Sequence, residues 1–209
     1  MNPDNALVGT VVRRIVRAMD PKRLVIAGVS NRHLHLSRDH ADRLFGPGYE
    51  PEKFRDLRQP GQYACKETVT IATHDGCLEK VRLLGPIRSE TQVELSASDA
   101  RRLGLALPLM KSGSGAGTPE VLLIGPRGSA TCSRGVGVAW RHLHLSTAEG
   151  EIFGLSDGDE TDVETTGDRS VVFRRVWVRV GANMLSEFHV DTDEANAAGL
   201  STGDMVRVL

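Results

Sequence analysis

The sequence predicts a mainly β protein made of two similar small β-barrel domains from an internal duplication, with short helices and an N-terminal amphipathic helix. Three observations predict this class. One motif occurs twice, as VSNRHLHLS at 29–37 and VAWRHLHLS at 138–146. Segments rich in alternating and β-branched residues follow each copy, which is typical of strands. Turn dipeptides such as Asp75-Gly76 and Gly85-Pro86 separate these segments, and many short strands with such turns favour barrels.

The composition excludes several classes of protein. The chain has 209 residues, and 26 Lys and Arg against 27 Asp and Glu give a net charge of -1, which is too little positive charge to bind duplex nucleic acid. Aromatic residues at 4% are too sparse for stacking on single strands. No apolar run reaches the roughly 20 residues of a membrane span. We therefore expect neither nucleic acid nor membrane as a partner. The 3 cysteines form no CxxC pair, which fits a reducing cytosol.

The first element expected along the chain is an amphipathic helix within residues 1–23. Its apolar residues recur at helical spacing, and arginines interrupt any signal-peptide core. We expect this helix to pack on a barrel. The first barrel half is expected at 24–137 and the second at 138–209, and the strand near 24–30 is the one that could pair with the second half. The Gly/Ser-rich stretch at 111–120 is expected to be a loop.

Each copy of the motif places two histidines on one face of a strand. Residues two apart in a strand point the same way, so His33 and His35 project together while the intervening leucines face the core. His142 and His144 do the same. Two imidazoles at this spacing can chelate a cation such as zinc. A single pair of this kind is more often a hydrogen-bonded surface pair, but its duplication favours metal binding.

A second repeated segment supplies the third ligand of each set. ELSASDARRLGL at 94–105 aligns with HVDTDEANAAGL at 189–200, which puts Glu94 opposite His189. We therefore expect one His-His-Glu site and one all-histidine site. Two other histidines, His40 and His74, are expected at the surface. The arginines that precede the histidine pairs, Arg32 and Arg141, are expected to form structural ion pairs.

Arg88 follows a Gly-Pro turn in LGPIRSETQVE at 84–94, six residues before Glu94. Arginine grips phosphate through two parallel hydrogen bonds and stays charged. Most arginines are solvated surface charges, but a turn beside an expected metal ligand makes anion binding an equal alternative. Thr91 and Gln92 add hydrogen-bonding groups.

Taken together, these motifs make the sequence resemble the phosphate propanoyltransferase family of propanediol-utilisation type, the phosphotransacylases associated with bacterial microcompartments. The resemblance runs from about Leu24 to Leu209. It is carried by both RHLHLS motifs and by GVSNRHLHLS, FGPGYE, QPGQYACKETVTI, LGPIRSETQVE and HVDTDEANAAGL. Typical members have a second half closer to RHIHM, and Cys65 stands where a small residue is common. Neither departure touches an expected ligand. For residues 1–23 the resemblance adds an alternative to a helix packed on a barrel, namely part of the encapsulation segment that some members carry.

The resemblance implies a two-zinc enzyme that moves a short acyl group between coenzyme A and inorganic phosphate, with propanoyl as the expected group. It implies two zinc ions per chain. The first would be held by His33, His35 and Glu94 and the second by His142, His144 and His189. Arg88 falls on the phosphate-gripping arginine. One zinc would accept the thiolate leaving group, and the other would position phosphate together with Arg88.

We expect coenzyme A, which is both substrate and product, in a groove of the first half. Its candidate contacts are Ser30, Arg55, Arg82, Leu84 and Asn196. The resemblance also implies acyl-CoA and phosphate as partners, a homodimer, a location in the bacterial cytoplasm inside a microcompartment, and shell or lumen proteins as further partners. A metal-dependent hydrolase, a cupin-like enzyme and a non-catalytic assembly module are the alternatives.

Overall fold

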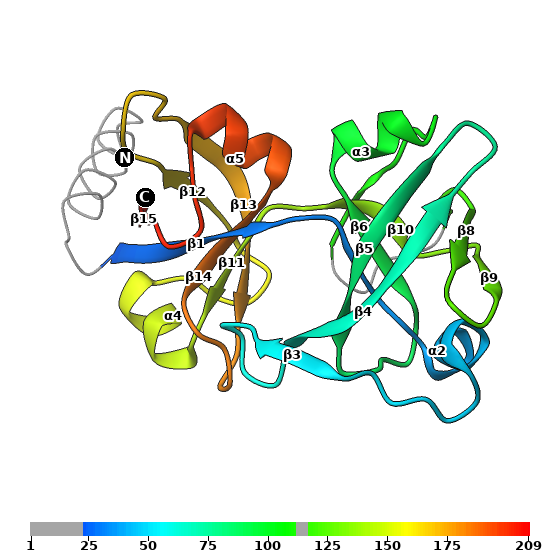
Figure 1. The fold of residues 1–209 in the computed structure, drawn as a ribbon. Coiled ribbons are helices and arrows are strands. Elements are labelled where there is room, and N and C mark those ends of the chain that lie inside the picture. The colour runs from blue at the N-terminus through cyan, green and yellow to red at the C-terminus, as the bar shows by residue number, and fades with distance from the viewer. Residues whose placement is uncertain (1–22, 112–116) are drawn as a thin grey trace, which may run out of the picture. The chain divides into compact units, whose positions relative to one another are not determined.

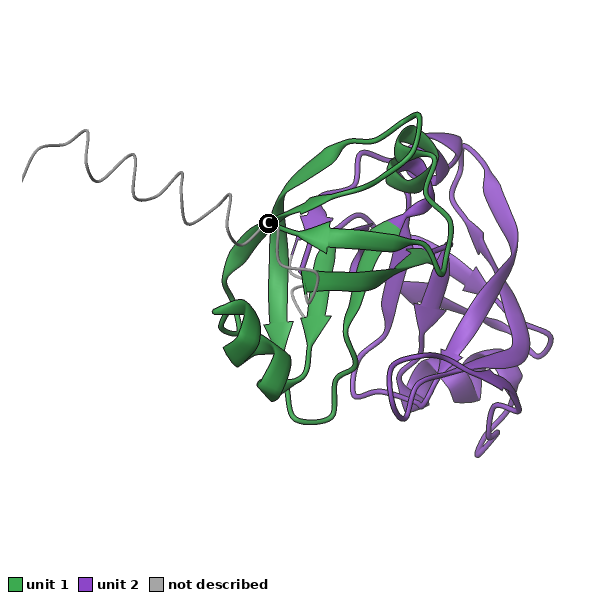
Figure 2. Cartoon of the chain, turned by 90° about the vertical axis from the view of Figure 1, so that its left-hand side faces the viewer, with its two compact units in different colours: residues 1–29, 141–190, 194–209 green, residues 30–140, 191–193 purple. Residues whose placement is uncertain are grey.

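The computed structural model describes residues 23–111 and 117–209, which form two compact units (Figures 1 and 2). One unit contains residues 30–140 and 191–193. The other contains residues 141–190 and 194–209 together with the described residues up to Val29. The expected N-terminal helix lies outside the described residues, apart from Arg23, and so do residues 112–116 of the expected loop at 111–120. The division at 23/24 and 137/138 stays a prediction.

The unit of residues 30–140 is a curled sheet in the order β7-β10-β6-β2-β5-β4-β8-β9, with β3 paired to β4. Two helices belong to it, α2 (Arg38–Phe45) and α3 (Ala97–Arg102). Serines at their N-caps, Ser37 and Ser96, each accept a hydrogen bond from a backbone N–H of the first turn, which explains why the helices begin directly after the strands β2 and β6. The strands are β2 (His33–His35), β3 (Lys53–Asp56), β4 (Tyr63–Ala72), β5 (Cys77–Gly85), β6 (Gln92–Leu95), β7 (Leu109–Met110), β8 (Val121–Ile124), β9 (Ser129–Cys132) and β10 (Val136–Ala139).

The other unit is a closed six-strand barrel in the order β1-β14-β11-β13-β12-β15. The first of the described strands, β1, pairs with the last, β15, and thus belongs to the barrel of the second half. The strands are β1 (Leu24–Ser30), β11 (His142–Leu145), β12 (Glu160–Glu164), β13 (Val172–Val180), β14 (Glu187–Asp191) and β15 (Met205–Val208), and the helices are α4 (Thr147–Phe153) and α5 (Thr192–Ala198).

Each unit has its own apolar core, built from alternating strand residues. In β2, Leu34 is buried in one cluster, and in β11, Leu143 and Leu145 are buried in the other. The histidines that alternate with them therefore project from the opposite face of each sheet. The core fixes the orientation of both histidine pairs.

The duplication is visible in the strand pairing as well as in the sequence. β2 is antiparallel to β6 and parallel to β5, and β11 is antiparallel to β14 and parallel to β13. The corresponding strands β5 and β13 each carry one non-glycine residue in the left-handed region at their fourth position, Lys80 at φ 55° and Arg175 at φ 56°. Such residues are uncommon, so their recurrence at matching positions extends the repeat beyond the motifs found in the sequence.

The mainly β class is confirmed, with one closed barrel, one curled half-barrel sheet and four helices in the described part of the chain. None of these helices combines the length and the apolar composition needed to cross a bilayer.

Candidate metal centre

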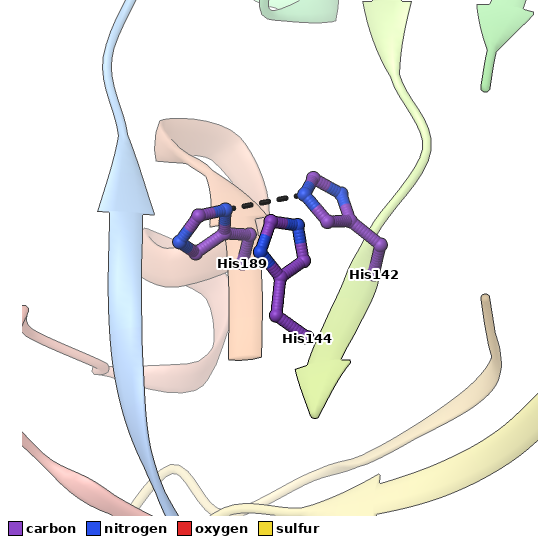
Figure 3. Close-up of side chains that lie close together, drawn as sticks. All are labelled: His142, His144 and His189. Carbon is purple, nitrogen blue, oxygen red and sulfur yellow. Dashed lines mark hydrogen bonds between the residues drawn. The ribbon is translucent and has the colours of Figure 1, made fainter. Parts of the chain in front are cut away.

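Three histidines from two neighbouring barrel strands converge in one cluster (Figure 3). His142 and His144 come from β11 and His189 from β14, and antiparallel pairing places His142 directly opposite His189. One nitrogen of each ring lies within 4.8 Å of the others, and among the described residues no other His, Cys, Asp or Glu group forms such a set. Nδ1 of His189 is 3.1 Å from Nε2 of His142. A zinc ion bound by nitrogen needs ligands this close together.

His144 supplies an independent test of fit to a metal. Both of its ring nitrogens are buried and have no hydrogen-bond partner. Burial, with smaller contributions from the charges of His189 and Arg179, lowers the pKa of His144 from 6.5 to about 3, so the ring is neutral at physiological pH. A buried, neutral and unsatisfied imidazole is suited to bind a metal ion, because the ligand form of histidine is the neutral ring. The cluster therefore fits zinc.

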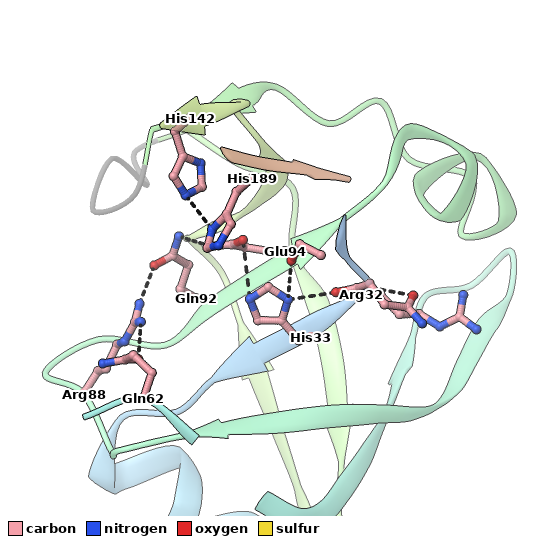
Figure 4. A network of polar contacts seen from close by, with 10 residues as sticks. Arg32, His33, Gln62, Arg88, Gln92, Glu94, His142 and His189 are labelled. Carbon is pink, nitrogen blue, oxygen red and sulfur yellow. Dashed lines mark hydrogen bonds and ion pairs between the residues drawn. The ribbon is translucent and has the colours of Figure 1, made fainter. Parts of the chain in front are cut away.

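The first expected set, in the other unit, is looser: His33 and Glu94 face each other (Figure 4), but His35 does not join them in a compact group. His33 lies opposite Glu94 in the β2–β6 ladder, with its Nε2 3.4 Å from Oε2 of Glu94. Nδ1 of His33 is 2.8 Å from the carbonyl oxygen of Asn31 and donates to it, so Nε2 is left to face Glu94. His35 is buried with no partner for its Nδ1, and burial followed by the charge of Arg88 lowers its pKa to about 2. His33 and Glu94 are brought together, but His35 does not complete a cluster as compact as the all-histidine one.

Arg88 is tied to the first set by a short chain of side chains (Figure 4). Its Nη1 donates to Oε1 of Gln92 at 3.1 Å, and Nε2 of Gln92 donates to Oε1 of Glu94 at 2.8 Å. Its Nη2 donates to Oε1 of Gln62 at 3.3 Å. The backbone N–H of Arg88 donates to the carbonyl oxygen of Leu36, which holds its Cα beside the end of β2. The guanidinium is thus held near a candidate ligand by two neutral amides.

Two further side chains near the candidate sites were missed by the sequence analysis. Gln62 contacts Arg88, and Oε2 of Glu187 lies 2.9 Å from Nε2 of His189. Glu187 stands two residues before His189 on the same strand face, at the position where the first half has Gln92. Alternation within the aligned repeat was the signal that could have found it.

The arginines that precede the histidine pairs form ion pairs, as expected. Arg32 bonds Asp99 at 2.6 Å, and Arg141 bonds Glu194 at 2.5 Å. Asp99 and Glu194 occupy the same place in the aligned repeat, on the helix that follows the third candidate ligand. Each pair therefore ties a histidine strand to the helix behind the third ligand.

The five expected coenzyme A contacts are divided between the units. Ser30, Arg55, Arg82 and Leu84 belong to one unit, and Asn196 is exposed on α5 of the other. Nη1 of Arg82 donates to the carbonyl oxygens of Cys65 and Lys66, and its guanidinium lies 6.0 Å from the ring centre of the exposed Phe54. Ser30 lies 3.3 Å from Nδ1 of His33, Arg55 is exposed and Leu84 is half-buried.

One surface expectation is wrong. His74 is exposed, with 88% of its side-chain surface accessible, but His40 is half-buried and its Nδ1 is 2.7 Å from Oγ1 of Thr91. Burial lowers the pKa of His40. Thr91 also accepts from the backbone N–H of Ser37, so it fastens the start of α2 to the turn before β6. The first turn of α2 carries His40 onto that turn, a contact that no sequence pattern indicates.

Comparison with known proteins gives one consistent result. A family model described as phosphate propanoyltransferase matches residues 26–201. A protein of Thermotoga maritima named phosphate propanoyltransferase is 49% identical and aligns with 95% of this chain and 95% of its own length. Proteins with the same name from Salmonella typhimurium and Listeria monocytogenes are 46% and 41% identical over 94% and 96% of this chain, and the alignments cover 93% and 94% of their lengths.

Proposed function

Because the chain belongs to the phosphate propanoyltransferase family, we propose that it moves a short acyl group between coenzyme A and inorganic phosphate, with propanoyl as the proposed group. Membership of this family makes the chain a transferase. In the forward direction acyl-CoA and phosphate give acyl phosphate and free coenzyme A. The observation that carries the proposal is the duplicated set of candidate ligands, in which Arg88 is linked to Glu94 through Gln92.

In this proposal the chain holds two zinc ions. His142, His144 and His189 hold one, and His33, His35 and Glu94 hold the other. When bound, the zinc ions supply Lewis acidity and an affinity for the coenzyme A sulfur. The neutral state of the buried histidines supports this role, since their lone pairs are available at physiological pH.

Arg88 performs the task that separates a transferase from a hydrolase, which is to select phosphate over water. Its guanidinium binds two phosphate oxygens and leaves a third oxygen free to attack the thioester carbonyl carbon. The new bond is C–O, the C–S bond breaks, and the electron pair leaves with the sulfur as a thiolate. Phosphate is itself the nucleophile, so no covalent protein intermediate is required. The positive charge of Arg88 also offsets the charge that develops on the carbonyl oxygen.

The remaining parts of the proposal concern the larger ligand and the setting. Coenzyme A is proposed to contact Ser30, Arg55, Arg82, Leu84 and Asn196. The homodimer, the location in a microcompartment of the bacterial cytoplasm and the contacts with shell or lumen proteins belong to the same proposal.

The test combines an assay with metal analysis. Purified protein is mixed with propanoyl-CoA, and free thiol is followed with and without phosphate, while bound metal is determined by elemental analysis. We expect thiol release that depends on phosphate, acyl phosphate as the product, and two zinc ions per chain. Equal thiol release without phosphate would instead favour the metal-dependent hydrolase. Active protein free of metal would refute the two-zinc site.

A further inference from the structure

Glu187 is a buried carboxylate beside the cluster of His142, His144 and His189, which is called the three-histidine group below. Only 8% of its side-chain surface is accessible, and it lies on β14 opposite His144 of β11 and two residues before His189. A carboxylate removed from water is costly unless hydrogen bonds or positive charge compensate for the lost hydration. Its position therefore calls for an explanation in terms of the groups it contacts.

The contact with His189 determines which nitrogen of that ring faces the cluster. Oε2 of Glu187 lies 2.9 Å from Nε2 of His189, and a carboxylate accepts hydrogen bonds, so this contact puts the imidazole proton on Nε2. A neutral His189 then has its lone pair on Nδ1. That atom is the one 3.1 Å from Nε2 of His142. Glu187 thus turns the metal-binding nitrogen of His189 toward the other two histidines.

Gly28 on the neighbouring strand β1 makes room for this arrangement. A Cβ at residue 28 would lie 2.6 Å from Oε1 of Glu187 and 2.8 Å from Cδ2 of His189. Both distances are too short for non-bonded atoms. The Glu187 carboxylate and the His189 ring therefore lie directly against the backbone of β1, in a space that only glycine leaves open.

The corresponding position of the first half has the complementary chemistry. There the third candidate ligand is Glu94, a hydrogen-bond acceptor, and the residue two positions earlier is Gln92, whose Nε2 donates to it at 2.8 Å. In the second half the third ligand is an imidazole with a proton to donate, and the residue two positions earlier is an acceptor, Glu187. Each half thus pairs the third ligand with a partner of opposite hydrogen-bonding character at the same register position.

We propose that Glu187 is a positioning residue that fixes the ring orientation and proton position of His189 and so sets the affinity of the three-histidine group for its metal ion. The proposal rests on the metal binding in the proposed function. Carboxylate partners of metal-binding histidines typically account for about 10- to 100-fold in metal affinity. A residue with a purely structural role would affect unfolding without a selective effect on one metal site.

The experiment compares metal release from the wild type and four variants. Glu187→Ala removes the acceptor, and Glu187→Gln keeps an amide oxygen that can still accept from Nε2. Glu164→Gln, on β12 of the same barrel, is the matched control, and His142→Ala marks the loss of the three-histidine site. Each protein is loaded with zinc, freed of excess metal and mixed with a chromophoric chelator, and thermal unfolding is recorded in parallel. Cobalt(II) is loaded in place of zinc to report the coordination geometry through its visible absorption.

We expect two release phases in the wild type and one of them missing in His142→Ala. In Glu187→Ala that same phase should become about 10- to 100-fold faster while the other phase is unchanged. Glu187→Gln should show a smaller acceleration and keep the cobalt spectrum of the wild type, and Glu164→Gln should match the wild type throughout.

Unchanged release from Glu187→Ala would overturn this proposal and leave the proposed function intact. If Glu187→Ala fails to fold, Glu187→Gln decides, and a release rate equal to that of the wild type would overturn the proposal. A wild-type protein that binds no zinc would overturn both this proposal and the two-zinc site.

Discussion

Replacing Arg88 by alanine is the perturbation that most directly tests the choice of phosphate as acceptor. The guanidinium now donates to the neutral amides of Gln62 and Gln92 at 3.3 and 3.1 Å, which are long hydrogen bonds that a charged phosphate would readily replace. Two charge-assisted hydrogen bonds contribute about 1.5–3 kcal/mol each. Their loss from the transition state should lower kcat/KM for phosphate by about 10²- to 10⁴-fold.

The assay measures thiol release against phosphate concentration for the wild type, Arg88→Ala, Arg88→Lys and a control. Lysine keeps the charge but lacks the planar fork, so Arg88→Lys should recover only part of the rate. Arg134→Ala is the matched control, because it removes one arginine from the same unit where 71% of the side-chain surface is accessible. Metal content should be unchanged in all variants, since guanidinium is not a zinc ligand. Phosphate-dependent turnover in Arg88→Ala equal to that of the wild type would remove this residue from the mechanism.

Three further predictions concern the barrel unit. Gly28→Ala places a methyl group 2.6 Å from Glu187, and the overpacking should lower the free energy of unfolding in urea by about 1–3 kcal/mol and weaken metal retention. Arg23→Ala deprives the backbone carbonyls of Val208, Phe153 and Leu209 of a donor. This loss should lower the free energy of unfolding by about 2–3 kcal/mol. Since the pKa of His144 is about 3 in the folded protein and 6.5 ordinarily, the unfolded chain binds more protons between these values. Zinc-free protein should therefore lose stability as the pH falls below 6.5, by up to about 1.4 kcal/mol per pH unit from this group.

Each of these predictions has a matched control. For Gly28→Ala it is Gly181→Ala, whose new Cβ would meet only the flexible side chain of Met184 at 3.3 Å. For Arg23→Ala it is Arg169→Ala, at an exposed position. For the pH dependence, His144→Gln should lose stability less steeply than the wild type as the pH falls. The control His74→Gln, at an exposed histidine, should lose stability as steeply as the wild type. Variants that behave like their controls would contradict the corresponding reasoning.

Strand alternation and the internal repeat were enough to predict the geometry around the second histidine pair. Alternation put His142 and His144 on one face, and aligning the two repeats put His189 at the position of Glu94. The structure places His142 directly opposite His189 and, in the other half, His33 directly opposite Glu94. These relations depend on local periodicity and on register, both of which leave a signal in the sequence.

Contacts between distant strands left no such signal. The space that Gly28 provides for Glu187 exists because β1 and β14 are neighbours in the barrel, although about 160 residues separate them in the chain. The half-buried position of His40 likewise depends on the turn before β6. Nor did the repeat predict that one sheet would close and the other would not. In each case tertiary packing decides, and it acts on residues whose local sequence is unremarkable.

The pairing of β1 with β15 bears on the order in which the parts of the protein fold during synthesis. Leu24 pairs with Arg207, and the neighbour of β1 on its other side, β14, begins at Glu187. During synthesis β1 emerges before either strand that it pairs with, whereas β2 to β10 find all their partners within residues 30–140. Non-local pairing of this kind carries a loop-closure cost that delays folding. The barrel is therefore closed only after residues 205–208 have left the ribosome.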